Sequence, residues 1–293
     1  MFAIETEKLT KYYGKSRGIV DLDLRVDVGD FFGFIGPNGA GKSTTIRTLL
    51  GLIKSSSGCG KIFGKDVELH KKEVLEDVGY LPSEAVFYSG MRVKEILKLS
   101  ADLRKMDCSK ASGELCERLR LDVNKKVEEL SFGNRKKVAI VCALQHNPRL
   151  CILDEPTGGL DPLMQKEFFS ILEERNKKGV TVFLSSHILS EVQHNCTKAA
   201  IIREGQIIAC DTVDKLAKTN AKRIHIEGNV DLSLLSKTKD IQKGENSVSF
   251  LYGGDINHLI KTLSQSKIND LSISDPDLEE IFMHYYTDEE EEQ

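Results

Sequence analysis

Short, continuous apolar runs stand out along the chain, and three of them end in glycine or polar residues. They lie at 31–36 (FFGFIG), 150–155 (LCILDE) and 180–187 (VTVFLSSH). Continuous rather than alternating apolarity indicates strands buried on both faces, as in a parallel sheet covered by helices. Because ligands bind at the carboxyl ends of such strands, we expect the residues there to form one site. Those residues are Gly36, Asp154, Glu155 and His187.

The apolar spacing becomes helical between about residues 84 and 147. Ile96, Leu97, Leu99 and Leu103 fall on one face of an expected helix. This pattern indicates a helical insertion into an α/β domain.

The pattern changes again after about residue 218. Strand-like segments (RIHIEG, SVSFLY and DLSIS) are mixed with helix-like segments (INHLIKTL and PDLEEIFMHYY). The last segment opens with an Asp-Pro pair, which is typical of a helix start, and its apolar residues follow the spacing of an amphipathic face. We therefore expect a main domain over residues 1–217, with its helical part at about 84–147, a small accessory α+β domain over 218–287 and an acidic tail over 288–293.

Composition narrows the class of protein. With 40% hydrophobic and 29% charged residues, the composition of the 293-residue chain is typical of a globular protein. It has no apolar run near the roughly 20 residues of a membrane span, and its first residues lack the apolar core of a secretory signal. Seven scattered cysteines without a CxxC pair argue against disulfides and zinc. We expect a cytoplasmic protein.

The net charge gives no sign of a nucleic-acid partner. It is −4 in total, and the five acidic residues at 288–292 account for it. The rest of the chain is close to neutral, whereas nucleic-acid binding requires a basic field.

The segment GPNGAGKST at 36–44 matches the pattern GxxxxGK[ST] between an apolar strand and an expected helix, TTIRTLLGLI. Backbone amides at such a loop and helix start cradle phosphates. Lys42 is expected to reach the β and γ phosphates, and the Ser43 hydroxyl to bind Mg²⁺. The alternative is a merely structural glycine turn. The nucleotide contacts expected here are Gly36, Asn38, Gly39, Ala40, Gly41, Lys42, Ser43 and Thr44.

Two adjacent acids end a buried strand, where a carboxylate is costly unless a cation or substrate uses it. Asp154 is the natural second contact to Mg²⁺, and Glu155 can polarise an attacking water. A neutral His187 can support the γ-phosphate or orient that water. Alone, the acids would indicate a helix cap or loop, and the histidine a structural role.

The segment LSFGNRKKV at 130–138 predicts a second anion site. Ser131 is expected to cap a helix, Gly133 to permit close backbone approach, and the basic run at 135–137 to open the helix. Because the loop at 36–44 already supplies one cradle, a second makes sense if it closes over nucleotide held by another subunit. The alternative is a basic helix turn at the surface.

Together these motifs resemble the nucleotide-binding subunit of ABC transporters over residues 1 to about 215. GPNGAGKST is similar to the Walker A loop, LCILDEP to Walker B, LSFGNRKKV to the signature motif, GLDP at 159–162 to the D-loop and SSH to the H-loop. The resemblance implies an α/β P-loop NTPase with a mainly parallel sheet, an antiparallel β portion near the N-terminus, a helical insertion and a small C-terminal α+β domain.

The resemblance also implies roles for individual residues. It implies Mg²⁺-dependent ATP hydrolysis with Lys42, Glu155 and His187 as catalytic groups. Tyr13 would stack on adenine, unless it is a core tyrosine, and Asp161 would contact nucleotide from the D-loop. Ser131 and Gly133 would press onto nucleotide held by a second copy in a head-to-tail dimer.

The partner implied by the resemblance is a separate membrane permease, bound at the cytoplasmic face through the surface 83–91 and the helical insertion. The ending DLEEIFMHYY looks like that of subunits driving ABC-2 type exporters of drugs, antibiotics or peptides. A soluble ATP-dependent clamp or regulator without a transport role is the alternative. A small-molecule kinase or GTPase would leave the signature, D-loop and H-loop motifs unexplained.

The sequence departs from the family pattern at four places. Ser83, followed by Glu84, stands where a glutamine is usual, although Ser83 could still contact the metal through water. Gly158 replaces the usual serine or asparagine of the D-loop, and Phe132 and Asn134 replace signature residues. We expect slower turnover or altered cooperativity, with the hydrolytic groups intact.

Overall fold

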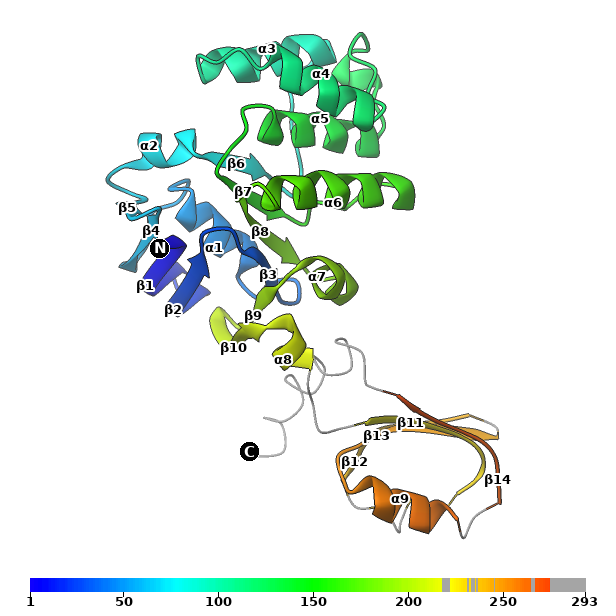
Figure 1. Cartoon of the computed structure of the whole chain (residues 1–293). Helices are drawn as coiled ribbons and strands as arrows, with labels where there is room; N and C mark the ends of the chain where they lie inside the picture. The colour runs from blue at the N-terminus through cyan, green and yellow to red at the C-terminus, as the bar shows by residue number, and fades with distance from the viewer. Residues whose placement is uncertain are drawn as a thin grey trace. The chain divides into compact units, whose positions relative to one another are not determined.

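The computed structural model describes residues 1–217, 222–230, 232, 235, 237–244, 246–264 and 267–274 (Figure 1). The chain divides into two compact units, Met1–Val213 and Asp214–Gln293. The division falls within the first turn of α8 (Val213–Ala217). The boundary expected from the sequence, after residue 217, follows this helix.

A six-stranded sheet forms the centre of the first unit, in the order β10-β9-β3-β8-β7-β6. The pairs β9–β3, β3–β8, β8–β7 and β7–β6 are parallel, and β10 is antiparallel to β9. The mainly parallel sheet predicted from the apolar runs is therefore confirmed. Its strands are β3 (Phe31–Ile35), β6 (Val78–Leu81), β7 (Leu150–Asp154), β8 (Thr181–Ser186), β9 (Lys198–Arg203) and β10 (Gln206–Thr212).

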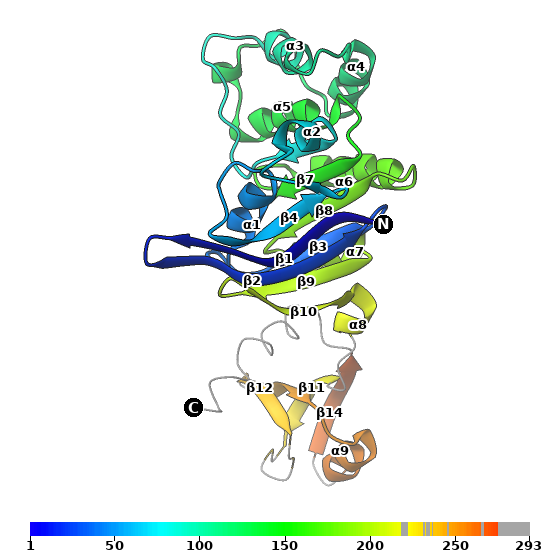
Figure 2. The same ribbon diagram turned by 90° about the vertical axis from the view of Figure 1, so that its left-hand side faces the viewer.

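A second, antiparallel sheet comes from the N-terminal part of the chain, as the family resemblance implied. Its order is β2-β1-β4-β5. The long hairpin of β1 and β2 is seen along its length in Figure 2. The strands are β1 (Phe2–Tyr13), β2 (Ser16–Asp27), β4 (Ser57–Ile62) and β5 (Lys65–Asp66).

Helices cover the parallel sheet. One buried cluster joins apolar residues of both sheets and of α1 (Lys42–Leu49), so α1 packs in the core between the sheets. Helices α6 (Pro162–Asn176) and α7 (Leu189–Asn195) pack on β8, and α7 also packs on β3. A Cβ atom at Gly33 would overlap Val192, so this glycine lets α7 lie against the strand. Burial on both faces explains why these strands are continuously apolar.

Between β5 and β7 the chain forms four helices and a 3₁₀ turn, gathered at the β6 side of the sheet (Figures 1 and 2). The three helices that follow β6, with the 3₁₀ turn, make up the helical insertion expected at about 84–147. A Cβ atom at Gly79 would overlap the Ala143 carbonyl oxygen, so α5 packs closely on β6. The apolar face expected at 96–103 is only partly correct, because Ile96 and Leu97 are buried but Leu103 is 78% exposed. The elements are α2 (Lys71–Glu76), α3 (Val93–Leu103), α4 (Ser109–Arg118), η1 (Val127–Glu129) and α5 (Phe132–Leu144).

In the part of the second unit that the structure describes after residue 221, a four-stranded antiparallel sheet packs against α9. The strand order is β12-β13-β11-β14, and Ile224, Phe250 and Leu259 lie in its core. The predicted helix at 275–287 and the acidic tail at 288–293 lie outside the described residues. The elements are β11 (Lys222–Asn229), β12 (Thr238–Lys243), β13 (Ser247–Tyr252), α9 (Ile256–Leu263) and β14 (Lys267–Ser274).

Across the ranges that the structure describes, no helix combines the length and apolarity needed to cross a membrane.

Candidate functional site

Four neighbouring parallel strands end at one edge of the central sheet. Ile35 at the end of β3 pairs with Ser186 of β8, and Asp154 at the end of β7 pairs with Ser185. β6 ends beside β7, at Leu81. The structure therefore brings the four expected strand-end residues, together with Ser83, to one place on the molecule.

The glycine loop between β3 and α1 has no space for a side chain at two of its three glycines. A Cβ atom at Gly36 would lie 2.5 Å from the Ile202 carbonyl oxygen, and one at Gly41 would lie 2.9 Å from that of Gly18. Gly39 and Gly41 have φ values of 83° and 111°, which favour glycine. Gly41 directly precedes α1, so the amides of the first helical turn are directed into the loop.

Helix α1 is shorter than the segment TTIRTLLGLI suggested. It ends at Leu49, because Gly51 adopts a left-handed φ of 60° and its amide bonds to the Thr48 carbonyl. A left-handed glycine just past the last turn is a common way for a helix to end.

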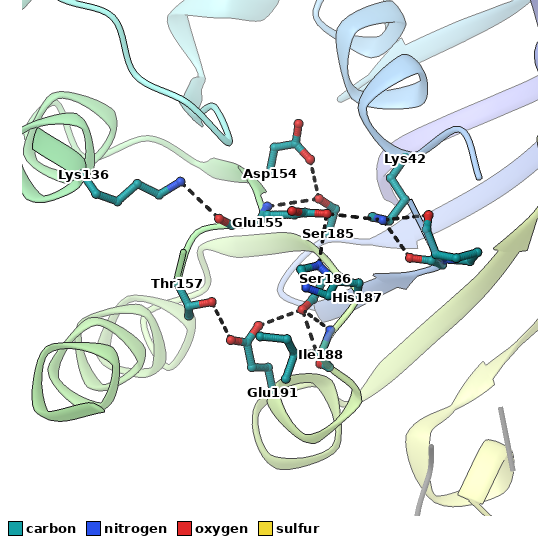
Figure 3. A network of polar contacts seen from close by, with 12 residues as sticks. Lys42, Lys136, Asp154, Glu155, Thr157, Ser185, Ser186, His187, Ile188 and Glu191 are labelled. Carbon is teal, nitrogen blue, oxygen red and sulfur yellow. Dashed lines mark hydrogen bonds and ion pairs between the residues drawn. The ribbon is translucent and has the colours of Figure 1, made fainter. Parts of the chain in front are cut away.

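Lys42 is buried and its ammonium lies between the loop and Glu155. Its Nζ donates to the carbonyl oxygens of Gly36, at 2.7 Å, and Pro37, at 3.1 Å. The same atom lies 3.4 Å from Oε1 of Glu155 (Figure 3). The positive charge therefore lies where the helix start and the strand-end carboxylate meet.

Glu155 is the centre of this cluster. Its backbone has a φ of 46°, which is unusual for a residue other than glycine. Its amide donates to the Ser185 carbonyl oxygen at 3.1 Å, and its Oε1 lies 3.3 Å from Nδ1 of the half-exposed His187. One carboxylate oxygen is thus in reach of both Lys42 and His187.

Asp154 is 1% exposed, and its Oδ1 accepts a hydrogen bond of 2.6 Å from the Ser185 hydroxyl. The carboxylate of Asp154 and the hydroxyl of Ser43, in the first turn of α1, supply the hard oxygen atoms that Mg²⁺ prefers. These residues therefore fit the expected metal.

Tyr13 and Thr44, two expected nucleotide contacts, meet beside Gly18. A Cβ atom at Gly18 would lie 3.1 Å from Cγ2 of Thr44 and 3.2 Å from Cε2 of Tyr13. The Tyr13 side chain is about half exposed at the end of β1. An exposed ring beside the glycine loop is suited to stack on a flat base.

The segment at 131–133 lies against the segment at 159–161 of the same chain. Ser131 caps α5, accepting a hydrogen bond of 3.3 Å from the Asn134 amide, and Asp161 caps α6 in the same way. A Cβ atom at Gly133 would overlap the Gly159 carbonyl oxygen. The side-chain hydrogen bonds of Ser131 and Asp161 therefore stay within their own helix starts.

The basic run at 135–137 suggested that Lys136 would contribute to an anion site. The structure shows instead that Lys136 points inward. It is 2% exposed, and its Nζ donates to the carbonyl oxygens of Pro82, Ser83 and Glu155. Burial lowers the pKa of Lys136 to about 8, although the nearby Asp154 and Glu155 charges oppose the shift. Sequence reasoning missed this contact because carbonyl groups leave no signal in side-chain patterns.

Glu191 is a second residue that sequence reasoning missed. Its carboxylate accepts hydrogen bonds from the hydroxyls of Thr157 and Ser186. The Ser186 hydroxyl in turn accepts from the Ile188 amide at 2.9 Å, so both neighbours of His187 belong to this network (Figure 3). The one available signal was an acid four residues after His187.

A glycine loop leads from a parallel strand into a helix whose first residue is a lysine, and a buried acid ends a second strand of the same sheet. These features define a P-loop nucleoside triphosphatase. The family model described as ABC transporter matches residues 19–158. The bacitracin transport ATP-binding protein BcrA of Bacillus licheniformis is 40% identical over 230 residues, which cover 76% of this chain and 74% of that protein.

Solved structures show the same fold. The ATP-binding subunit of an ABC transporter is similar with a TM-score of 0.69 and 30% identity, covering 73% of this chain and 91% of that one. The dimeric structure of MJ0796, a bacterial ABC transporter cassette, has a TM-score of 0.66 and 23% identity, covering 72% and 98%. The chain therefore belongs to the ATP-binding proteins of the ABC transporter family, and it is an ATP hydrolase.

Proposed function

We propose that this chain is the subunit that hydrolyses ATP to power a separate membrane permease, and that the transporter exports a drug, an antibiotic or a peptide. The observation that carries the hydrolytic part is the position of the Glu155 carboxylate, 3.4 Å from Nζ of Lys42 and 3.3 Å from Nδ1 of His187. The kinship with a bacitracin transport protein supports the exporter part.

In this proposal each group at the strand ends has a separate task. The loop amides and Lys42 hold the phosphates, and Ser43 and Asp154 bind Mg²⁺, which neutralises phosphate charge when present. The Glu155 carboxylate accepts a hydrogen bond from the attacking water and orients that water towards the γ-phosphorus. His187 donates to a γ-phosphate oxygen, and Tyr13 stacks on the adenine. Ser83 is left with a water-mediated metal contact.

The second anion site belongs to a dimer in this proposal. The contact of Gly133 with Gly159 places the segments 131–133 and 159–161 side by side. Because the side-chain hydrogen bonds of Ser131 and Asp161 stay within their own helix starts and Gly133 packs against Gly159, we infer that these residues act on nucleotide held by a second copy, arranged head to tail. ATP then closes the pair and hydrolysis reopens it, which is a population switch for an attached permease.

The proposed permease contact is an exposed apolar groove between α2, the segment after β6, and α3. It has a volume of about 620 Å³ and includes Val86, Phe87, Tyr88, Leu99 and Leu103 in its lining. Val86 is 92% exposed and Tyr88 73% exposed. Apolar side chains so exposed favour a protein partner. Binding there would hold the chain at the cytoplasmic face of the membrane.

Light scattering of Glu155→Gln protein with and without Mg·ATP tests the shared site. The substitution removes the carboxylate while keeping the shape, so the closed pair should accumulate and the mass should rise from monomer to dimer. Wild-type protein should hydrolyse ATP and the variant should not. A variant that hydrolyses at the wild-type rate would overturn the role of Glu155.

Co-purification tests the transport role. Recovery of the tagged chain with an integral membrane protein supports the permease, whereas recovery only in soluble complexes supports a clamp or regulator without transport.

A further inference from the structure

The ammonium group of Lys136 connects three parts of the hydrolytic site. Its Nζ donates to the carbonyl oxygens of Ser83 at 2.8 Å, Pro82 at 3.0 Å and Glu155 at 3.1 Å. Lys136 belongs to the second turn of α5, and its acceptors follow β6 and β7. One side chain therefore joins the start of α5 to two strand ends, and Figure 3 shows its contact with Glu155.

These three bonds use the full donor capacity of a lysine. An ammonium has three protons, and each finds a carbonyl acceptor here. At 2% exposure the group is desolvated, and a buried charge without such partners would be strongly destabilising. The lysine can therefore not leave this position without losing bonds that water does not replace.

The contact with Glu155 bears on the backbone of the proposed catalytic residue. On its amino side the Glu155 amide donates to the Ser185 carbonyl oxygen, and on its other side the Glu155 carbonyl accepts from Lys136. Between these two anchors the residue holds a φ of 46°. A non-glycine residue persists in this region only when its surroundings hold it there.

We propose that Lys136 is a positioning residue for hydrolysis, which fixes the Glu155 backbone and ties it to the start of α5 and to the Ser83 segment. Any displacement of the α5 start then either moves Glu155 or breaks buried hydrogen bonds. This inference rests on the proposed role of Glu155 in ATP hydrolysis. Lys136 itself contacts neither water nor phosphate in this scheme.

The test compares Lys136→Met and Lys136→Arg in the full chain, with Lys98→Met as the matched control. Methionine keeps the length and removes the charge and donors. Arginine keeps the charge but presents its donors in a planar fork that cannot match three converging carbonyls. Lys98 lies in the same helical part, exposed, in a surface pair with Asp102.

We expect kcat to fall at least about tenfold in both variants, while the Kd for a fluorescent ATP analogue changes by less than about threefold, because the phosphate cradle is untouched. The Lys98→Met control should keep both values. A purely structural role would instead weaken binding and hydrolysis together. If Lys136→Met does not fold, Lys136→Arg supplies the same comparison of kcat with Kd.

The outcomes separate this inference from the proposed function. If wild-type hydrolysis does not depend on Glu155, the proposed function fails first. If it does, and a folded Lys136 variant keeps the wild-type kcat or loses nucleotide affinity in step with kcat, the positioning role is wrong and the function stands.

Discussion

Gly133, in the first turn of α5, is packed directly against the backbone of Gly159, and a Cβ atom there would overlap the Gly159 carbonyl oxygen. The contact joins the two segments that we propose act on nucleotide in the second copy. The contact explains why position 133 requires a glycine. The preceding position does not, and it holds Phe132. The Phe132 ring also lies over Gly159.

Gly133→Ala should therefore separate the α5 start from the 159–161 segment. We expect a loss of stability of about 1–3 kcal/mol, as for other overpacked positions, and a larger loss of hydrolysis than of ATP binding. Gly113→Ala is the matched control, because Gly113 lies in α4 with open space around its Cβ position. The control should gain roughly 0.5–1 kcal/mol from helix propensity. Thermal unfolding and ATPase rates measure both; equal stability of the two variants would contradict the packing argument.

Glu191→Ala should disturb the turn that carries His187. The substitution removes the acceptor of the Thr157 and Ser186 hydroxyls, and Ser186 also holds the Ile188 amide. We expect a roughly tenfold fall in kcat, near 1.4 kcal/mol of barrier, with ATP affinity preserved. Glu173→Ala, an exposed site on α6, should change neither value. Steady-state kinetics measure kcat, and a nucleotide titration measures the ATP affinity. An unchanged kcat would show that Glu191 has no role in hydrolysis.

Acid should destabilise the first unit through His146. Burial, assisted by the charges of Arg104 and Arg175, lowers the pKa of His146 to about 4 from an ordinary value of 6.5. The unfolded chain therefore binds this proton more tightly than the folded chain. The contribution of His146 to the free energy of unfolding is complete above pH 6.5 and is lost as the pH falls towards 4, by roughly 3 kcal/mol in total. In His146→Leu this acid-dependent loss should be smaller.

Urea unfolding followed by circular dichroism at pH 7.5 and at pH 4.5 measures that difference. His70→Leu serves as control, because His70 is half exposed in a surface pair with Glu73. The same pH dependence in wild-type and His146→Leu protein would show that the histidine is not the responsible group.

Val86→Asp tests the groove proposed for the permease. Because Val86 is 92% exposed, the substitution should leave folding and the ATPase rate of the isolated chain unchanged. Recovery with the membrane partner should fall, since a carboxylate would have to be desolvated in an apolar contact. Leu52→Asp places the same charge at another exposed apolar site and should retain the partner. Loss of the partner in both variants would point to charge alone.

The sequence by itself determined the parallel sheet, the glycine loop and the residues at the strand ends. These follow from local patterns: continuous apolarity reports burial on both faces, and parallel strands covered by helices end at one edge. The same reasoning found the helix capped by Ser131, because a cap and its helix are neighbours in the chain.

Only the tertiary structure decided where side chains with several possible roles would lie. A basic run suggested an anion site, yet Lys136 turns inward, because carbonyl groups distant in sequence surround it. Leu103 continues an apolar helical face, yet it is exposed and lines an open groove. Such outcomes depend on which segments fold against one another, and a local pattern does not contain that information.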